Sequence, residues 1–224
     1  MTDLEFTVSG VTPVDLGIVP MLRFNLRIIN KAGIETIRSL SLHTQIQIQC
    51  PQRAYTAKER ERLVDLFGTP ERWGETLRTR LWTHVDTTVP TFSESIEVGL
   101  TVPCSFDLNV ASAKYFYALE GGEISLLFLF SGTIFYDTAH GGLQIQRVSW
   151  EKETVYRMPV KVWKELMDYH FPNSAWLSLD RSTFEQLHDY KCRHHLANWD
   201  QTIQRLLAAN ESGQRVNIRE EALV

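Results

Sequence analysis

One segment in the middle of the chain is apolar at nearly every position of a strand. Residues 124–130 read Ile-Ser-Leu-Leu-Phe-Leu-Phe and run directly into residues 131–136. A strand with one solvated face alternates apolar and polar side chains, whereas a strand covered on both faces reads as a continuous apolar run. The segment therefore predicts a central strand covered on both sides, and the rest of the chain must supply its neighbours and its cover.

Strand patterns surround this segment. The cleanest alternation runs from Ser39 to Cys50, with Leu, Ile and Thr on one face and Ser41, His43 and three glutamines on the other. This is the pattern of a half-buried antiparallel strand with a wet, uncharged face. Pro103 confines the strand that contains it to an edge or a bulge. Further strands are predicted over residues 4–11, 20–30, 82–89, 94–108 and 143–156.

Helical patterns interrupt and follow the strands. Thr56 and Glu59 have the spacing of a capping box, which predicts a helix to about residue 67, and a second short helix is expected over 71–81. At Pro159 the apolar period changes from two to about 3.6, the period of a helix. A helix to about His170 and a longer one from Asp180 to about 209, broken near 197–198, are predicted after it.

These elements predict an α+β fold. It consists of an antiparallel β-sheet body of about six to eight strands, a helical insertion over about 56–81 and a C-terminal helical layer over about 159–209. A chain of 224 residues fits one domain, which we assign to residues 1–209, with a flexible tail over 210–224.

Composition narrows the class of partner. The 23 basic and 27 acidic residues give a net charge of −4 without a dense basic run, so we expect neither a nucleic-acid nor a membrane partner. Three cysteines do not form a disulfide framework, which favours a reducing compartment. The acidic N-terminus has no apolar signal region, and no run reaches a membrane span of about 20 residues. We expect a cytoplasmic protein.

One spacing is compatible with a metal site. His188, Cys192 and His195 recur at i, i+4 and i+7, which places them on one face of a helix. Neutral imidazoles and a thiolate are good zinc ligands, but the usual two short ligand pairs are missing. The alternative is an amphipathic helix that carries two surface histidines and a half-buried cysteine.

No catalytic residue and no cofactor is assigned. Cys50 or Cys104 with His43 or His84 has the residue types of a cysteine nucleophile and its base, but such a pair must lie within hydrogen-bonding reach. Cysteine is among the most buried residue types, so structural thiols are the favoured interpretation. The glycine pairs Gly121-Gly122 and Gly141-Gly142 match no glycine-rich phosphate-binding motif.

Tryptophans are the candidates for a partner-binding surface, because aromatic side chains are enriched at protein interfaces. The four that we select are Trp73, Trp82, Trp163 and Trp176. Trp163 also belongs to a stripe with Leu166, Met167 and His170, and a stripe of this kind forms the core side of most helices. Core packing is therefore the competing interpretation.

The chain resembles an uncharacterised bacterial family, a domain of unknown function associated with gene clusters of actinobacterial-type nickel–iron hydrogenases. The resemblance covers nearly the whole chain. The segments that carry it are 63–68 (Leu-Val-Asp-Leu-Phe-Gly), 72–77 (Arg-Trp-Gly-Glu-Thr-Leu), 81–85 (Leu-Trp-Thr-His-Val), 102–104 (Val-Pro-Cys), 130–133 (Phe-Ser-Gly-Thr) and 171–174 (Phe-Pro-Asn-Ser). It implies no activity, only a genomic neighbourhood.

The second half is also similar, in the order of its elements, to the export chaperone SecB. Strands, a helix that starts at Pro159, then Phe171-Pro172, spaced leucines and a second helix follow one another. About three extra residues separate Phe171-Pro172 from Phe184, and the insertion after Cys50 has no counterpart. The similarity implies an antiparallel sheet with helices on one side and apolar grooves open to a client.

These considerations favour a non-enzymatic accessory or chaperone-like protein. Its expected partner is a protein client, for which the first resemblance implies a hydrogenase subunit or maturation factor, and a homo-oligomer is compatible with the sequence. One alternative is a metal-handling or thiol-dependent protein that uses His188, Cys192 and His195. Another is a stoichiometric subunit of a larger complex.

Overall fold

The structure is a computed structural model that describes residues 3–14, 18–31, 36–104, 110–138, 142–175 and 177–221. The chain divides into two compact units, residues 1–174 and residues 175–224. Every strand of the described residues belongs to the first unit, and the second contains two helices. The predicted single domain over 1–209 and its tail stay a prediction.

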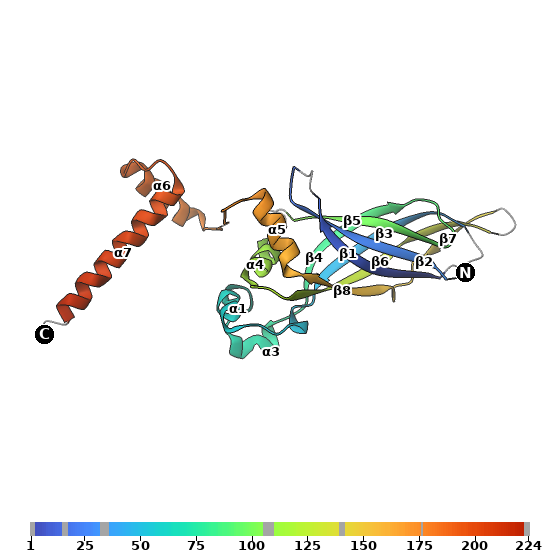
Figure 1. The fold of residues 1–224 in the computed structure, drawn as a ribbon, viewed down its shortest axis with the longest axis horizontal. Coiled ribbons are helices and arrows are strands. Elements are labelled where there is room, and N and C mark those ends of the chain that lie inside the picture. Colours follow the sequence, from blue (N-terminus) through green and yellow to red (C-terminus); the bar gives the residue numbers. More distant parts are fainter. Residues whose placement is uncertain are drawn as a thin grey trace. The chain divides into compact units, whose positions relative to one another are not determined.

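The first unit is a sandwich of two antiparallel sheets (Figure 1). Sheet A has the order β1-β2-β5, and sheet B has the order β4-β3-β6, with β7 and β8 pairing different parts of β6. The strands span Leu4–Pro13 (β1), Met21–Asn30 (β2), Ile37–Ile48 (β3), Arg80–Val89 (β4), Ser95–Pro103 (β5), Glu123–Asp137 (β6), Leu143–Arg147 (β7) and Glu153–Pro159 (β8). The α+β class with six to eight antiparallel strands is confirmed, and the structure adds that they form two sheets.

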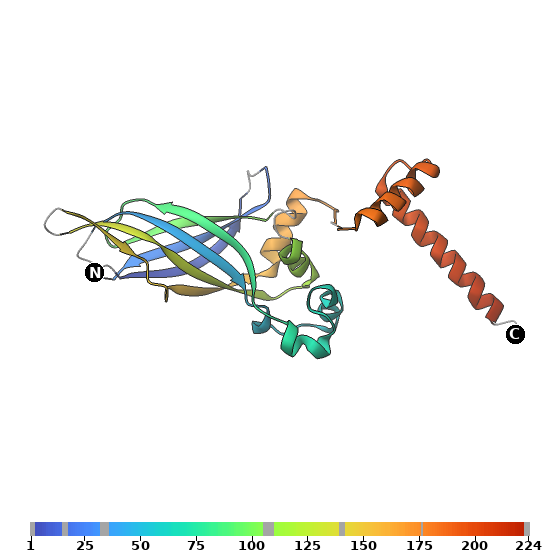
Figure 2. The same cartoon turned by 180° about the vertical axis from the view of Figure 1, so that it is seen from behind.

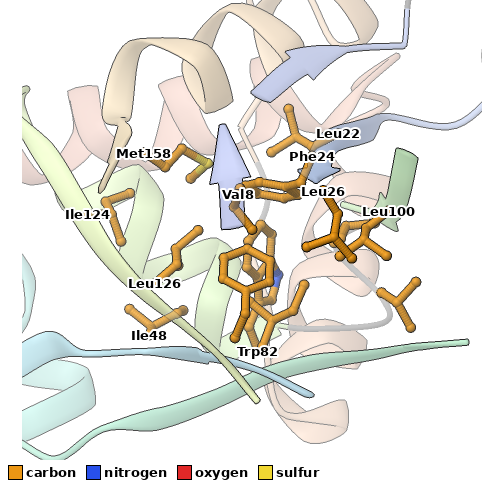
Figure 3. Close-up of a cluster of buried hydrophobic side chains, with 14 of the residues drawn as sticks. Val8, Leu22, Phe24, Leu26, Ile48, Trp82, Leu100, Ile124, Leu126 and Met158 are labelled. Carbon is orange, nitrogen blue, oxygen red and sulfur yellow. The ribbon is translucent and has the colours of Figure 1, made fainter. Parts of the chain in front are cut away.

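Aromatic side chains join the two sheets. The ring of Phe6 on β1 stacks on that of Phe130 on β6, with centroids 4.5 Å apart. Phe24 on β2 meets Phe128 on β6 edge to face at 5.3 Å. Figure 3 shows this core, in which leucines of sheet A face apolar side chains of sheet B. Because fully buried aromatic rings dominate the energetics of a core, these contacts fix how the sheets face each other.

Strand β6 is central in sheet B, as its apolar sequence predicts, since β3 pairs one side of it and β7 and β8 pair the other. Its inward side chains, among them Leu126 and Phe128, are buried. Its outward side chains Leu127 and Leu129 are only half-buried. The expectation that both faces are covered is therefore met on one face and not on the other.

The insertion between β3 and β4 is helical, but its helices are shorter than predicted. The elements are η1 (Cys50–Gln52), α1 (Ala57–Arg62), α2 (Val64–Phe67), η2 (Pro70–Arg72) and α3 (Trp73–Thr76). The capping box is confirmed, because the Thr56 hydroxyl accepts from the backbone N–H of Glu59 and the Glu59 carboxylate accepts from that of Thr56. The predicted helix over 71–81 ends at Thr76, and β4 begins at Arg80.

Helices α4 (Val110–Ala118) and α5 (Val160–His170) complete the first unit, and Figures 1 and 2 show α1, α3, α4 and α5 gathered at one end of the sandwich. The second unit contains α6 (Arg181–Arg193) and α7 (Trp199–Glu221), and Asp180 occupies the N-cap position of α6. The predicted break near 197–198 is confirmed, since residues 194–198 separate the two helices.

A buried ion pair ties the insertion to the start of β6. Arg53 Nη2 lies 2.6 Å from Glu59 Oε1, and the guanidinium also donates to the carbonyls of Gly121 and Glu123. Glu59 additionally accepts from the backbone N–H of Glu120 at 2.8 Å. Burial raises the pKa of Glu59, but the hydrogen bonds from Glu120 and Thr56 and the charge of Arg53 outweigh it, so the pKa lies below its ordinary value.

Removing the buried hydroxyl of Thr44 should stabilise the protein. Thr44 lies on the inner face of β3 with 0% of its surface exposed, and its Oγ1 has no hydrogen-bond partner among the residues that the structure describes. A buried polar group without a partner costs about 1–3 kcal/mol, so Thr44→Val should raise the free energy of unfolding by about 1 kcal/mol in urea titrations. Thr88→Val, at an exposed position of β4, is the control and should change it by less than about 0.5 kcal/mol. A destabilised Thr44→Val protein contradicts this assignment.

Breaking the ion pair should destabilise the protein in a pH-dependent way. Loss of one partner of a buried pair costs about 3–5 kcal/mol, which we expect for Glu59→Gln at pH 7. Because the folded pKa of Glu59 is lowered, its stabilising effect is present above the unfolded value, near 4.5, and is lost as the pH falls through the folded pKa.

The measurement is urea unfolding of the wild type and Glu59→Gln between pH 7 and pH 3. The difference in unfolding free energy between the two proteins should shrink across this range. A difference that stays constant down to pH 3 contradicts an ionised Glu59 in the folded state.

Candidate interaction surface

Two of the four selected tryptophans lie in the core. Trp82 on β4 and Trp163 on α5 are each 5% exposed. The ring of Phe116 on α4 joins them, with centroids 5.0 Å from Trp82 and 5.4 Å from Trp163. Both indoles thus pack the helices against the end of the sandwich, and the surface that we carry forward does not include them.

The other two tryptophans differ from these. Trp73 begins α3 and is half-buried, with its Nε1 donating to the carbonyl of Gly68 at 2.9 Å and its ring at edge contact with Tyr55 and Phe67. Trp73 thus holds parts of the insertion together, and part of its indole ring stays accessible. Trp176 lies outside the described residues.

The structure brings together two of the three predicted metal ligands. Cys192 Sγ lies 3.8 Å from His188 Nδ1 on the exposed side of α6. Helix α6 ends at Arg193, and His195 follows the end with a φ of 54°, so the helical spacing does not extend to it. The described residues contain no group of three or more His, Cys, Asp or Glu side chains that could hold a metal ion.

The other two cysteines lie inside the fold. Cys50 and Cys104 are buried. Burial raises the pKa of the Cys50 thiol to about 11 and that of Cys104 to about 12, so both stay protonated near neutral pH. His43 and His84, the two candidate bases, are exposed, whereas both thiols are buried.

The outer face of sheet B carries a row of exposed and half-buried apolar side chains that one glutamine interrupts. The register aligns Leu81 on β4 with Gln47 on β3, Gln47 with Leu127 on β6, and Leu127 with Val155 on β8. Directly opposed residues of an antiparallel sheet point to the same face. Leu81 is 50% and Val155 51% exposed, and Leu127 is half-buried. With Leu129, which lies two residues further along β6, these side chains form what we call the β6 outer patch.

A local irregularity brings Leu81 to this patch. The register between β3 and β4 shifts between Ile46 and Gln47, which leaves Trp82 in the core while Leu81 faces outward. Bulges of this kind commonly redirect a side chain. The same register shift therefore places Leu81 in the patch and Trp82 in the core.

Uncharged and titratable polar groups border the patch. Gln45 and Gln47 lie among its apolar side chains on the neighbouring strand. Further along β3, His43 Nδ1 lies 2.6 Å from Asp86 Oδ1, and the rings of His43 and His84 stack with centroids 5.2 Å apart. Apolar area with hydrogen-bonding groups around it is the composition of a protein-binding surface.

Sequence reasoning did not select the residues of this patch. The signal was present, because Leu127 and Leu129 occupy the second face of the most apolar strand. A strand that is apolar on its second face predicts a cover within the fold. Among the described residues, neither leucine packs against the core cluster.

The fold and the patch define an antiparallel β-sandwich protein with a helical end and an apolar sheet surface. The chain belongs to the family of unknown function DUF6084, whose model matches residues 1–215.

Comparison with curated proteins gives no match. Similar solved structures include β-glucosidase 3B from Thermotoga neapolitana with α-D-glucose and with glycerol, each at 19% identity and a TM-score of 0.26. The match covers 70% of this chain and only 17% of the glucosidase chain. None of the helices among the described residues is long and apolar enough to cross a membrane.

Substitution of the buried tryptophans by alanine should lower the free energy of unfolding. Truncation of a buried Trp typically costs about 3–5 kcal/mol, and we expect this loss for Trp82→Ala and Trp163→Ala in denaturant titrations. Trp73→Ala is the comparison and should cost less, because that side chain is only half-buried. If Trp82→Ala kept wild-type stability, its placement in the core would be wrong.

Proposed function

We propose that this protein is a non-enzymatic accessory or chaperone-like protein that binds a protein client through the β6 outer patch. One observation carries the proposal, which is that the most apolar strand has two leucines on the face that it does not bury in the sandwich, close to the exposed Leu81 and Val155. Soluble proteins rarely leave such surface open unless a partner covers it.

The mechanism is burial of apolar client surface without nucleotide hydrolysis. Leu81, Leu127 and Val155 form a row across the sheet, onto which an apolar segment of the client packs. The neighbouring glutamine amides offer both donors and acceptors to the client's polar groups. Burial of each large apolar side chain contributes about 1.5–3 kcal/mol. Micromolar binding requires about 8 kcal/mol beyond the cost of association, so the client must bury several such side chains on the patch.

The identity of the client rests on resemblance. The association of similar chains with nickel–iron hydrogenase gene clusters suggests a hydrogenase subunit or a maturation factor. The similarity in element order to SecB suggests the same class of activity, the holding of an incompletely assembled chain. A permanent subunit of the complex is the other form of this proposal, and it differs in staying bound to the mature enzyme.

A charged side chain in the patch should abolish client binding. We expect Leu81→Arg and Val155→Arg to reduce recovery of hydrogenase precursors or maturation factors by more than tenfold in tagged pull-downs at native expression, read by mass spectrometry. Thr7→Arg is the matched control, since it adds the same charge at an exposed position of β1 in sheet A. Thermal melts of the three variants serve to check that each one folds.

Three results separate the possibilities. Loss of the client with Leu81→Arg and Val155→Arg but not Thr7→Arg supports the patch. Retention of the client by both patch variants overturns it. Recovery of the protein with the mature, active hydrogenase identifies a subunit, whereas recovery with precursors alone identifies an accessory protein.

A further inference from the structure

A thiol and an imidazole on α6 lie at the separation of two zinc ligands. Cys192 Sγ lies 3.8 Å from His188 Nδ1, one helical turn earlier, and both side chains are exposed. In a tetrahedral zinc site, bonds of about 2.3 Å to sulfur and about 2.0 Å to nitrogen place the two ligand atoms about 3.6 Å apart. The pair is therefore close to the geometry that the metal requires, and zinc takes the place of a proton that the two atoms share.

Aromatic rings restrict the imidazole of this pair. The ring centroid of His188 lies 6.3 Å from that of Phe184 on the same helix and 6.2 Å from that of Trp199, which begins α7. The rings of Phe184 and Trp199 also contact each other, with centroids 5.2 Å apart. Because these contacts limit the orientations of the imidazole before the metal arrives, less conformational entropy is lost on binding.

The chain supplies two ligands, whereas a structural zinc site has four. Among the described residues, no third His, Cys, Asp or Glu side chain joins this pair in a group that could hold a metal ion. His194 stacks on Tyr190 instead, with ring centroids 4.3 Å apart, and His195 follows the end of the helix with a φ of 54°. Two such pairs, one from each of two copies, give the two cysteines and two histidines of a closed tetrahedral site.

The unit that carries the pair exposes the apolar side chains next to it. Phe184 is 46%, Trp199 38% and Ile203 40% exposed, and among residues 177–210 only Thr202 is buried. Small units that lack a sufficient core are commonly stabilised by a metal or by association with another chain. Because Phe184 and Trp199 contact His188, a second copy that shares the metal also brings apolar side chains of its own to this surface.

We propose that two copies of this chain share one zinc ion, to which each contributes Nδ1 of His188 and Sγ of Cys192. The site lies between the two α6 helices and is incomplete in a single copy. The shared ion lies on a two-fold axis, so the association is isologous and stops at a dimer. Each Cys192 thiol releases its proton to solvent when the sulfur binds the ion as a thiolate.

Zinc binding by the full chain tests this site. The protein is stripped of metal by a chelator, kept reduced with a phosphine, titrated with Zn²⁺ and followed by light scattering after size-exclusion chromatography. We expect one zinc ion per two chains, and a mass that rises from 25.9 kDa to twice that value when zinc is added. Co²⁺ in place of zinc should give thiolate-to-metal charge-transfer absorption, for which Cys192 is the available thiol because Cys50 and Cys104 are buried.

Three substitutions separate the ligands from their neighbours. His188→Gln and Cys192→Ser should each lose zinc retention, the cobalt absorption and the change in mass, and both should keep the fold because the positions are exposed. His195→Asn is the matched control, since it removes a nearby imidazole and asparagine tolerates the positive φ of that position. It should bind zinc and dimerise like the wild type. Circular dichroism checks that all three variants keep their helices.

Four results overturn the proposal. A wild type that retains no zinc, or that binds one ion per chain without a change in mass, excludes a site shared between two copies. A dimer that is already present without metal excludes zinc as the link. Loss of zinc in His195→Asn assigns the ligands to a single chain, and retention of zinc by both His188→Gln and Cys192→Ser excludes the pair.

Discussion

The sandwich depends on the antiparallel pairing of β6 with its neighbours. This strand has fifteen residues, pairs with β3 over most of their common length and carries β7 and β8 on its other side. Its Phe128 and Phe130 make the ring contacts that hold sheet A. At Gly132, whose φ is 150°, an added Cβ would lie 2.1 Å from the carbonyl oxygen of Ser41, so β3 approaches closely only because no side chain intervenes.

The two faces of β6 lie in different environments. The alternation of side chains directs Leu126 and Phe128 into the sandwich and Leu127 and Leu129 out of it. The first set is buried in the core, and the second set is half-buried and does not pack against the core cluster of the described residues. The Arg53–Glu59 pair holds the insertion beside the beginning of this strand, through the carbonyl of Glu123. The helical end thus holds one terminus of β6 in place.

Local patterns predicted the elements well and their pairing poorly. Alternation identified the strands at residues 4–13, 21–30 and 37–48, and the Thr56–Glu59 spacing identified the start of α1, because both signals arise from neighbours in the chain. The division into two sheets depends on β5 pairing with β2, about seventy residues earlier, and no local period encodes that choice.

The candidate surface was harder to predict for the same reason. An indole has the same sequence signature in a core and at an interface, so Trp82 and Trp163 could be selected but not placed. The i, i+4, i+7 spacing of His188, Cys192 and His195 assumed a helix that continues, whereas α6 ends at Arg193. The outer face of β6 was visible in the sequence, but whether another element covers it is a property of the three-dimensional arrangement.

The central claim is that a protein partner covers the outer face of β6, and site-specific photo-cross-linking tests it most directly. A benzophenone side chain replaces Val155 in one protein and Thr7, on sheet A, in another, and both are irradiated in cells that express the natural partners. We expect position 155 to form one dominant adduct with a defined protein, and position 7 to form none. Equal labelling from both positions, or no adduct from position 155, would contradict the claim.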